Sequence, residues 1–130
     1  MVNPKNILLF SPPENSAAIR LQGAVANVVP WDNITIIQKT ESLFHILRQP
    51  QNKVEATVIL VSSCKELDDL LNFRDLLHRN CIILVLPDQN KTTITLGHVL
   101  RPRFLTFTDS DFSDVRDVLK KILGKVSAES

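Results

Sequence analysis

Three short, almost wholly apolar runs constrain the fold of this chain more than any other feature. They are Ile7–Phe10, Ala56–Val61 and Cys81–Leu86, and each is followed directly by serine or proline. Runs of this length, rich in β-branched residues, favour strands over helices. Continuous apolar strands are typical of a parallel sheet that is buried on both faces. The chain is therefore expected to form a sheet with helices on both sides.

Helix-type patterns separate these runs, and two more polar strand-like segments complete the series. Helices are expected over residues 14–27, 40–49, 63–79 and 111–123, and the two further strands over residues 34–38 and 104–108. Thr40 and Asp111 are expected to cap their helices, and Gly124 to end the last one. Ser63 and Glu66 match a capping box. Residues 89–103 favour only a short or irregular helix, because Gly97 and Pro102 interrupt them.

Strand polarity indicates the order of the sheet. The strands at residues 34–38 and 104–108 contain Thr and Gln, which suits the two edges. That arrangement favours the flavodoxin-like order 2-1-3-4-5, a doubly wound five-stranded parallel sheet in a three-layer α/β/α architecture. The length of 130 residues fits a single domain over residues 1–130. Residues 125–130 are expected to be a polar tail.

Composition narrows the function classes. The net charge is +1 with both signs mixed along the chain, so no nucleic-acid partner is expected. No apolar run approaches the roughly 20 residues that cross a bilayer, and the N-terminus lacks the layout of a signal peptide. Cys64 and Cys81 are expected to be reduced thiols in a cytoplasmic protein. None of the three glycines follows a strand directly, so no dinucleotide cofactor is expected, nor any other.

Ligands of such sheets bind beyond the carboxyl ends of the strands, where the order reverses. The candidate residues in the loops there are Glu14, Ser62, Ser63, Cys64, Asp88 and Asp109. Ser62, Ser63 and Cys64 form either a nucleophile loop or, as we favour, the N-cap of a helix. The acids, together with Asp111, either bind a metal from separate loops or, as we favour, belong to turns and caps. No metal site is therefore predicted.

The size, the alternation and the expected order resemble the receiver domains of bacterial two-component response regulators. Receivers carry a pair of acids after strand one, where this chain has Ser11-Pro12 and a single acid at Glu14. They carry a phosphoacceptor aspartate at the end of strand three, where Val61-Ser62-Ser63 stands here. Leu86-Pro87 replaces their Ser or Thr after strand four, and Phe107-Thr108 replaces their lysine after strand five. The resemblance thus implies a pseudo-receiver, a degenerate member that lacks aspartyl phosphorylation.

The resemblance also implies where a partner would bind. Receivers signal through the face of their fourth helix, fifth strand and fifth helix, about residues 92–123 here. The candidates for a protein partner or for self-association are Ile94, Leu96, Val99, Leu100, Arg101 and Arg103. The two arginines would alternatively contact phosphate or RNA, or discourage edge pairing. The competing hypothesis is a small flavodoxin-like enzyme or ligand binder that uses Ser62, Cys64, Asp88 and Asp109.

Overall fold

The computed structural model describes residues 6–11, 16–49 and 54–127. Glu14 and the last three residues of the expected tail lie outside these ranges. The elements are β1 (Asn6–Phe10), α1 (Ser16–Ala26), η1 (Trp31–Asn33), β2 (Ile34–Ile37), α2 (Thr40–Arg48), β3 (Val54–Leu60), α3 (Cys64–Leu71), α4 (Arg74–His78), β4 (Ile82–Leu86), α5 (Lys91–Val99), β5 (Phe104–Phe107) and α6 (Ser113–Ser127). Among the described residues, no helix is long and apolar enough to cross a membrane.

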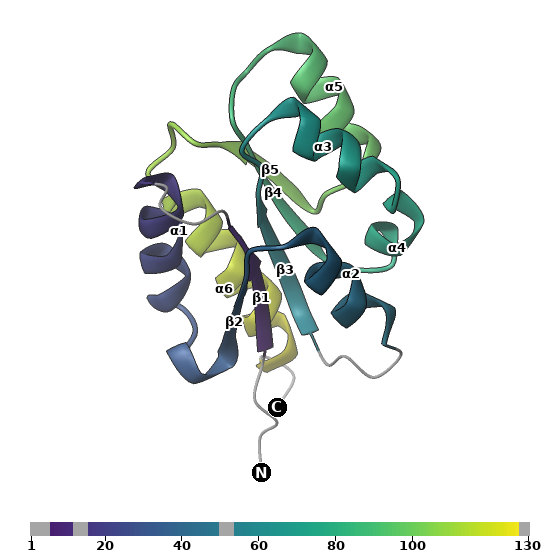
Figure 1. Ribbon diagram of the computed structural model, residues 1–130. Coiled ribbons are helices and arrows are strands. Elements are labelled where there is room, and N and C mark those ends of the chain that lie inside the picture. The colour runs from purple at the N-terminus through teal and green to yellow at the C-terminus, as the bar shows by residue number, and fades with distance from the viewer. Residues whose placement is uncertain (1–5, 12–15, 50–53, 128–130) are drawn as a thin grey trace.

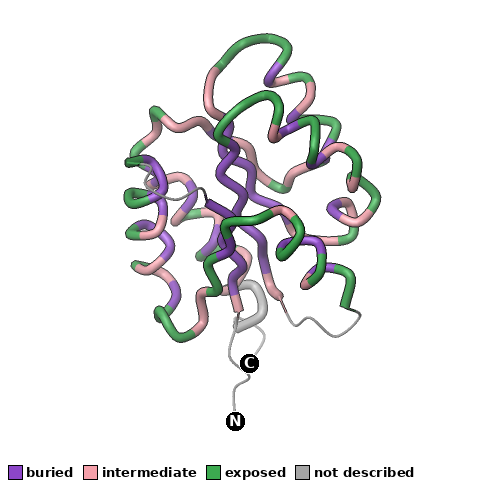
Figure 2. The backbone as a smooth tube through the Cα atoms, in the orientation of Figure 1, coloured by how far each residue is buried: buried purple, intermediate pink, exposed green. Residues whose placement is uncertain are grey.

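The five strands are all parallel and lie in the order β2-β1-β3-β4-β5, which confirms the flavodoxin-like prediction. Helices α1 and α6 cover one face of the sheet, and α2 to α5 cover the other (Figure 1). Side chains alternate between the faces, so Leu9 packs under α1 and α6 whereas Leu8 packs toward the other helices. The central strands are buried throughout most of their length (Figure 2).

The helix expected over residues 63–79 is two helices, so that prediction was wrong. α3 ends at Leu71, and α4 begins at Arg74 after Phe73 takes non-helical backbone angles, φ −119° and ψ 25°. The ring of Phe73 stacks on Phe44 of α2, with centroids 3.9 Å apart. Packing between the two aromatic rings accompanies the break, and it joins the connection between α3 and α4 to the neighbouring α2.

The segment expected to be irregular contains a regular helix, α5, from Lys91 to Val99. Gly97 accounts for this difference. A Cβ atom at Gly97 would lie 3.1–3.3 Å from side-chain atoms of Leu86, Leu105 and Leu84, closer than ordinary packing. The glycine therefore costs some helix propensity but lets α5 approach the sheet, and tertiary packing outweighs the local preference.

Two expected helix ends were also wrong. Thr40 is the first residue of α2, whose N-cap is Lys39, and no side chain caps that end. At the other end of the chain, α6 passes Gly124 and continues to Ser127, so residues 125–127 of the expected tail are helical. Glycine weakens a helix without interrupting its hydrogen bonds, because it keeps its N–H donor.

Leu100 is not a surface residue, in contrast to the prediction that it lies on the partner face. Its side chain is 0% exposed and packs in the core beneath α2 to α5. Val99 beside it is 42% exposed, whereas Ile94 and Leu96 are half-buried and pack against the same core. Leu100 at the end of α5 thus points into the core, an orientation that the sequence alone could not predict.

Candidate functional site

The candidate site lies at the carboxyl edge of the sheet, where the strand order reverses between β1 and β3. A pocket of about 300 Å³ opens there. Its lining residues come from α1 and from the ends of three strands: Ser16, Ala17, Arg20, Val61, Ser62, Pro87, Thr108 and Asp109. The structure therefore brings together two of the predicted candidates, Ser62 and Asp109. Thr108, from the loop expected here after the last strand, also lines the pocket, and so does Arg20, which was not predicted.

The strand ends at this edge carry neutral side chains. Ser11 follows β1, is 1% exposed, and donates its backbone N–H to the carbonyl of Ile37 over 3.0 Å. Its hydroxyl oxygen has no hydrogen-bond partner among the described residues. Ser62 is exposed after β3, and Pro87 follows β4. A carboxylate at these ends would supply the charge that metal binding needs, and none of these three residues does.

Arg20 of α1 reaches across the edge to the loop after β5. Its Nη1 donates to the carbonyl of Ser110 and its Nη2 to the carbonyl of Thr108, each over 2.7 Å. Its Cζ atom lies 5.1 Å from the centre of the Phe112 ring. The planar guanidinium suits this combination of two hydrogen bonds and a cation–π contact. One sequence signal could have indicated the role, because Arg20 is the single charged residue of α1.

The loop that Arg20 holds is also fixed from within. Phe112 is fully buried and has a left-handed φ of 64°, which is unfavourable for an aromatic residue. Asp114 accepts hydrogen bonds from the hydroxyls of Thr106, at 3.0 Å, and Ser110, at 3.2 Å. These contacts, together with the buried ring, hold a backbone conformation that an isolated loop would avoid.

Asp111 was expected to cap the last helix, but α6 begins two residues later, at Ser113, and the Phe112 carbonyl accepts the first helical hydrogen bond, from Arg116. The Oδ1 atom of Asp111 accepts from the backbone N–H of Ser113 at 3.0 Å and from the Ser113 hydroxyl at 2.8 Å. These two hydrogen bonds from Ser113 hold the pKa of the Asp111 carboxyl below its ordinary value. The carboxylate is thus engaged in a turn that leads into α6, and the turn interpretation holds for this acid.

Ser63 is the N-cap of α3. Its hydroxyl accepts from the backbone N–H of Glu66 at 3.3 Å, while the Glu66 carboxylate accepts from the N–H of Ser62 at 3.0 Å. The reciprocal contact reaches the residue before the cap, one position earlier than in the standard capping box. The N-cap interpretation of this loop is therefore confirmed, with Glu66 engaged in it.

Cys64 does not lie beside a base. It is exposed, and its Sγ lies 3.3 Å from the hydroxyl oxygen of Thr93. Thr93 is not a proton acceptor of the kind that activates a thiol. Cys81 is half-buried, and burial raises the pKa of its thiol. Within the described residues, neither cysteine is placed as a nucleophile with its base.

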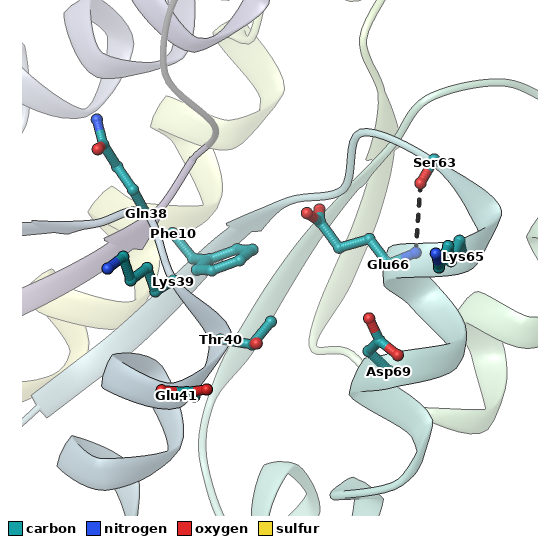
Figure 3. A pocket seen from close by; sticks show the side chains of 9 residues that line it. All are labelled: Phe10, Gln38, Lys39, Thr40, Glu41, Ser63, Lys65, Glu66 and Asp69. Carbon is teal, nitrogen blue, oxygen red and sulfur yellow. Dashed lines mark hydrogen bonds between the residues drawn. The ribbon is translucent and has the colours of Figure 1, made fainter.

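A second hollow, larger than the pocket beside Arg20, lies next to Ser63. It measures about 560 Å³ and lies between the segment after β2 and the start of α3. Phe10, Gln38, Lys39, Thr40, Glu41, Ser63, Lys65, Glu66 and Asp69 line it (Figure 3). The lining mixes two lysines with three acids, and Glu66 is already engaged in the cap. The hollow consequently shows no preference for a ligand of one charge.

The predicted acids of the remaining loops also have local roles. Asp88 accepts from the backbone N–H of Asn90 at 2.9 Å, and Asp109 accepts from the side-chain amide of Gln89 at 3.2 Å. No group of three His, Cys, Asp or Glu residues that could hold a metal occurs in the described part of the chain. The predicted acid Glu14 lies outside that part.

The parallel sheet and its strand order define the class as a flavodoxin-like α/β domain. Compared with protein-family models, with curated proteins and with solved structures, the chain matches none.

Replacing Arg20 with Ala tests the contact between α1 and the loop after β5. We expect Arg20→Ala to lower the free energy of unfolding by about 1–2 kcal/mol, because two hydrogen bonds to carbonyls and a ring contact are lost from an exposed site. Arg20→Lys should recover only part of this, because an ammonium cannot reproduce the two-pronged geometry. Denaturant unfolding would measure both variants.

The matched control is Arg79→Ala, a change at the exposed C-cap residue of α4. We expect a change within about 0.5 kcal/mol there. Equal effects at the two arginines would contradict the role assigned to Arg20.

Proposed function

We propose that this chain is a pseudo-receiver, a receiver-like domain that works in signalling or as an adapter through protein contact and is not phosphorylated on aspartate. The observation that carries this proposal is a sheet with the 2-1-3-4-5 order whose described strand ends carry neutral side chains at Ser11, Ser62 and Pro87. Ser11, Ser62 and Thr108 stand at the strand ends where the resemblance places charged residues. The fold is kept while the side chains for receiver chemistry are replaced.

Phosphoryl transfer to aspartate needs a carboxylate nucleophile and a metal held by oxygen ligands. The described acids at the carboxyl ends of the strands include Glu66, Asp88, Asp109 and Asp111, and each accepts a hydrogen bond. Glu66, Asp88 and Asp111 accept from backbone N–H groups, and Asp109 accepts from the side-chain amide of Gln89. Ser62 is uncharged, and no hydrogen bond joins its hydroxyl to a base in the described part of the chain. These residues support a binding role over a catalytic one.

The guanidinium of Arg20, at the carboxyl ends of the strands, is also engaged in contacts. Arg20 donates both of its terminal nitrogens to carbonyls of the β5–α6 loop and lies over Phe112. In this geometry the guanidinium holds the loop in one place. A loop fixed in this way supports constitutive contact with a partner rather than a contact switched by phosphorylation.

The α5–β5–α6 face is the contact surface that we propose. Val99, Arg101 and Arg103 are exposed on it. Arg101 has a left-handed φ of 51° at the position after the helix C-cap, where glycine is usual. An arginine that carries this backbone strain in an exposed position supports a role for its side chain. The proposed face keeps Ile94 and Leu96 as half-buried supports and excludes the buried Leu100.

Beryllium fluoride with magnesium tests the loss of phosphorylation. We expect the melting temperature to stay unchanged on adding both, because Ser62 stands where a receiver has its phosphoacceptor aspartate and the nearby Glu66 carboxylate is engaged in the cap of α3. Thermal unfolding with magnesium alone is the control. A clear stabilisation by the mimic would overturn the proposal, since ligands that bind the folded state raise its melting temperature.

A photoreactive side chain at position 99 tests the contact face. In the native host, we expect Val99 replaced by benzoylphenylalanine to give an adduct with a different protein, because this position is exposed on α5. The same replacement at exposed Glu41 of α2 is the matched control. Adducts from position 41 with none from position 99 would place the partner elsewhere and contradict the proposed face.

A further inference from the structure

The side of the molecule formed by α1, η1 and β2 has an unusual surface, which we call the α1–β2 side. Of the four exposed large hydrophobic side chains in the described part of the chain, three lie in these elements: Ile19 at 70%, Trp31 at 56% and Ile36 at 39%. The fourth, Val99, lies on α5. Exposed apolar side chains concentrated in three consecutive elements favour a surface that contacts another protein.

Charge is depleted over the same elements. Between Ser16 and Ile37, the charged residues are Arg20 and Asp32, although charged residues make up 22% of the whole chain. The guanidinium of Arg20 is engaged with Thr108 and Ser110, so it adds no free cation to this side. Depletion of charge is the compositional mark of the buried centre of an interface.

β2 is an open edge of the sheet, which Figure 1 shows nearest the viewer. Within the described residues it pairs with β1 alone. Its outer backbone N–H and C=O groups therefore have no strand to pair with. The strand Ile34–Ile37 contains neither a charge nor a proline, the usual devices that block such an edge. The edge is thus ready to accept another strand.

The charges at the two ends of β2 indicate which strand fits. Asp32 precedes it and Lys39 follows it, and both are exposed. A parallel neighbour of the same sequence would place aspartate beside aspartate and lysine beside lysine. An antiparallel neighbour of the same sequence places each acid near a lysine, at both ends at once. The edge is therefore electrostatically complementary to a second copy of itself about a twofold axis.

The alternation of side chains limits the register. Ile36 pairs with Leu9 and faces α1, whereas Thr35 pairs with Leu8 and faces α2. Directly opposed residues of an antiparallel pair point to the same face, so the twofold axis passes through Thr35 or through Ile36. In the first case Asp32 lies opposite Gln38 of the second copy, and in the other case opposite Thr40. Either register leaves Lys39 of the second copy one position away.

We propose that two copies of this chain associate by antiparallel pairing of their β2 edges, which joins the two sheets into one. The pairing places both α1 helices on the same face of the joined sheet and leaves both α5–β5–α6 faces free. The pairing is independent of the proposed function, because it uses β2, which lies at the opposite side of the sheet from β5. Four-residue strands bury less than the roughly 800 Å² per partner of a standard interface. The association is thus weak and depends on concentration.

Sedimentation velocity from about 1 μM to about 1 mM tests the pairing. The wild type should shift from monomer toward dimer across this range. Ile36→Lys should remain monomeric, because it places two like charges on the joined edge. Thr35→Lys, at another exposed position of β2, gives the same test if the first variant folds poorly. Val99→Lys at the other edge is the matched control and should dimerise like the wild type.

A charge swap tests the antiparallel arrangement. Asp32→Lys and Lys39→Asp should each raise the dimer dissociation constant about three- to tenfold, since each change creates two like-charge pairs in place of two exposed attractive ones. The double variant should return to within about twofold of the wild type, because the pairs are restored with their signs exchanged. A wild type that stays monomeric throughout would overturn the proposal. So would a dimer disrupted by Val99→Lys and not by Ile36→Lys, or a double variant no better than the single ones.

Discussion

Burial of the central strands on both faces is the constraint on which the rest of this structure depends. β1, β3 and β4 are apolar along most of their length, and two separate cores lie on either side of them. Burial of apolar surface stabilises the fold by roughly 25 cal/mol per Å². Strands that are apolar on both faces therefore need helices to cover both faces. Parallel order follows from the crossovers, and it brings all strand ends of one kind to a single edge. The position of any site at this edge is thus a consequence of the core.

The loops at the carboxyl ends of the strands are held by contacts that engage the charged side chains around them. Arg20 closes the edge by donating to two carbonyls, and the acids around it are engaged in turns and in the cap of α3. Each of these contacts fixes a neighbouring loop. The two edge strands of the sheet are β2 and β5. β5 adjoins the proposed partner face, and β2 carries the inferred pairing with a second copy.

Local sequence patterns were sufficient for the sheet and insufficient for several helices. Strand burial and polarity predicted the strand order, because both depend on short-range composition. The break at Phe73 depends on its ring stacking against Phe44 from another helix, which no local pattern reveals. α5 forms because Gly97 fits against three leucines of the sheet, and the same packing turns Leu100 inward. Its role as a surface residue was predicted wrongly for that reason.

The candidate site was predictable in its position and only partly in its members. Ser62 and Asp109 were expected at the edge from their places after strands, and the structure brings both to one pocket. Arg20 was missed because it lies on a helix and reaches a loop almost 90 residues away, at Ser110 and Thr108. Ser63 and Cys64 were predicted to lie in the same loop, but Ser63 lines a different hollow and Cys64 contacts Thr93.

Backbone amide NMR during a magnesium titration tests the central claim most directly, because it reports on the edge residue by residue. Magnesium binding at an acidic pocket would give saturable shifts at the amides of Ser11, Ser62 and Thr108. We expect no saturable change at these three amides up to millimolar magnesium, since the described strand ends there carry neutral side chains. Saturable shifts confined to these amides would show a working acidic site and contradict the account.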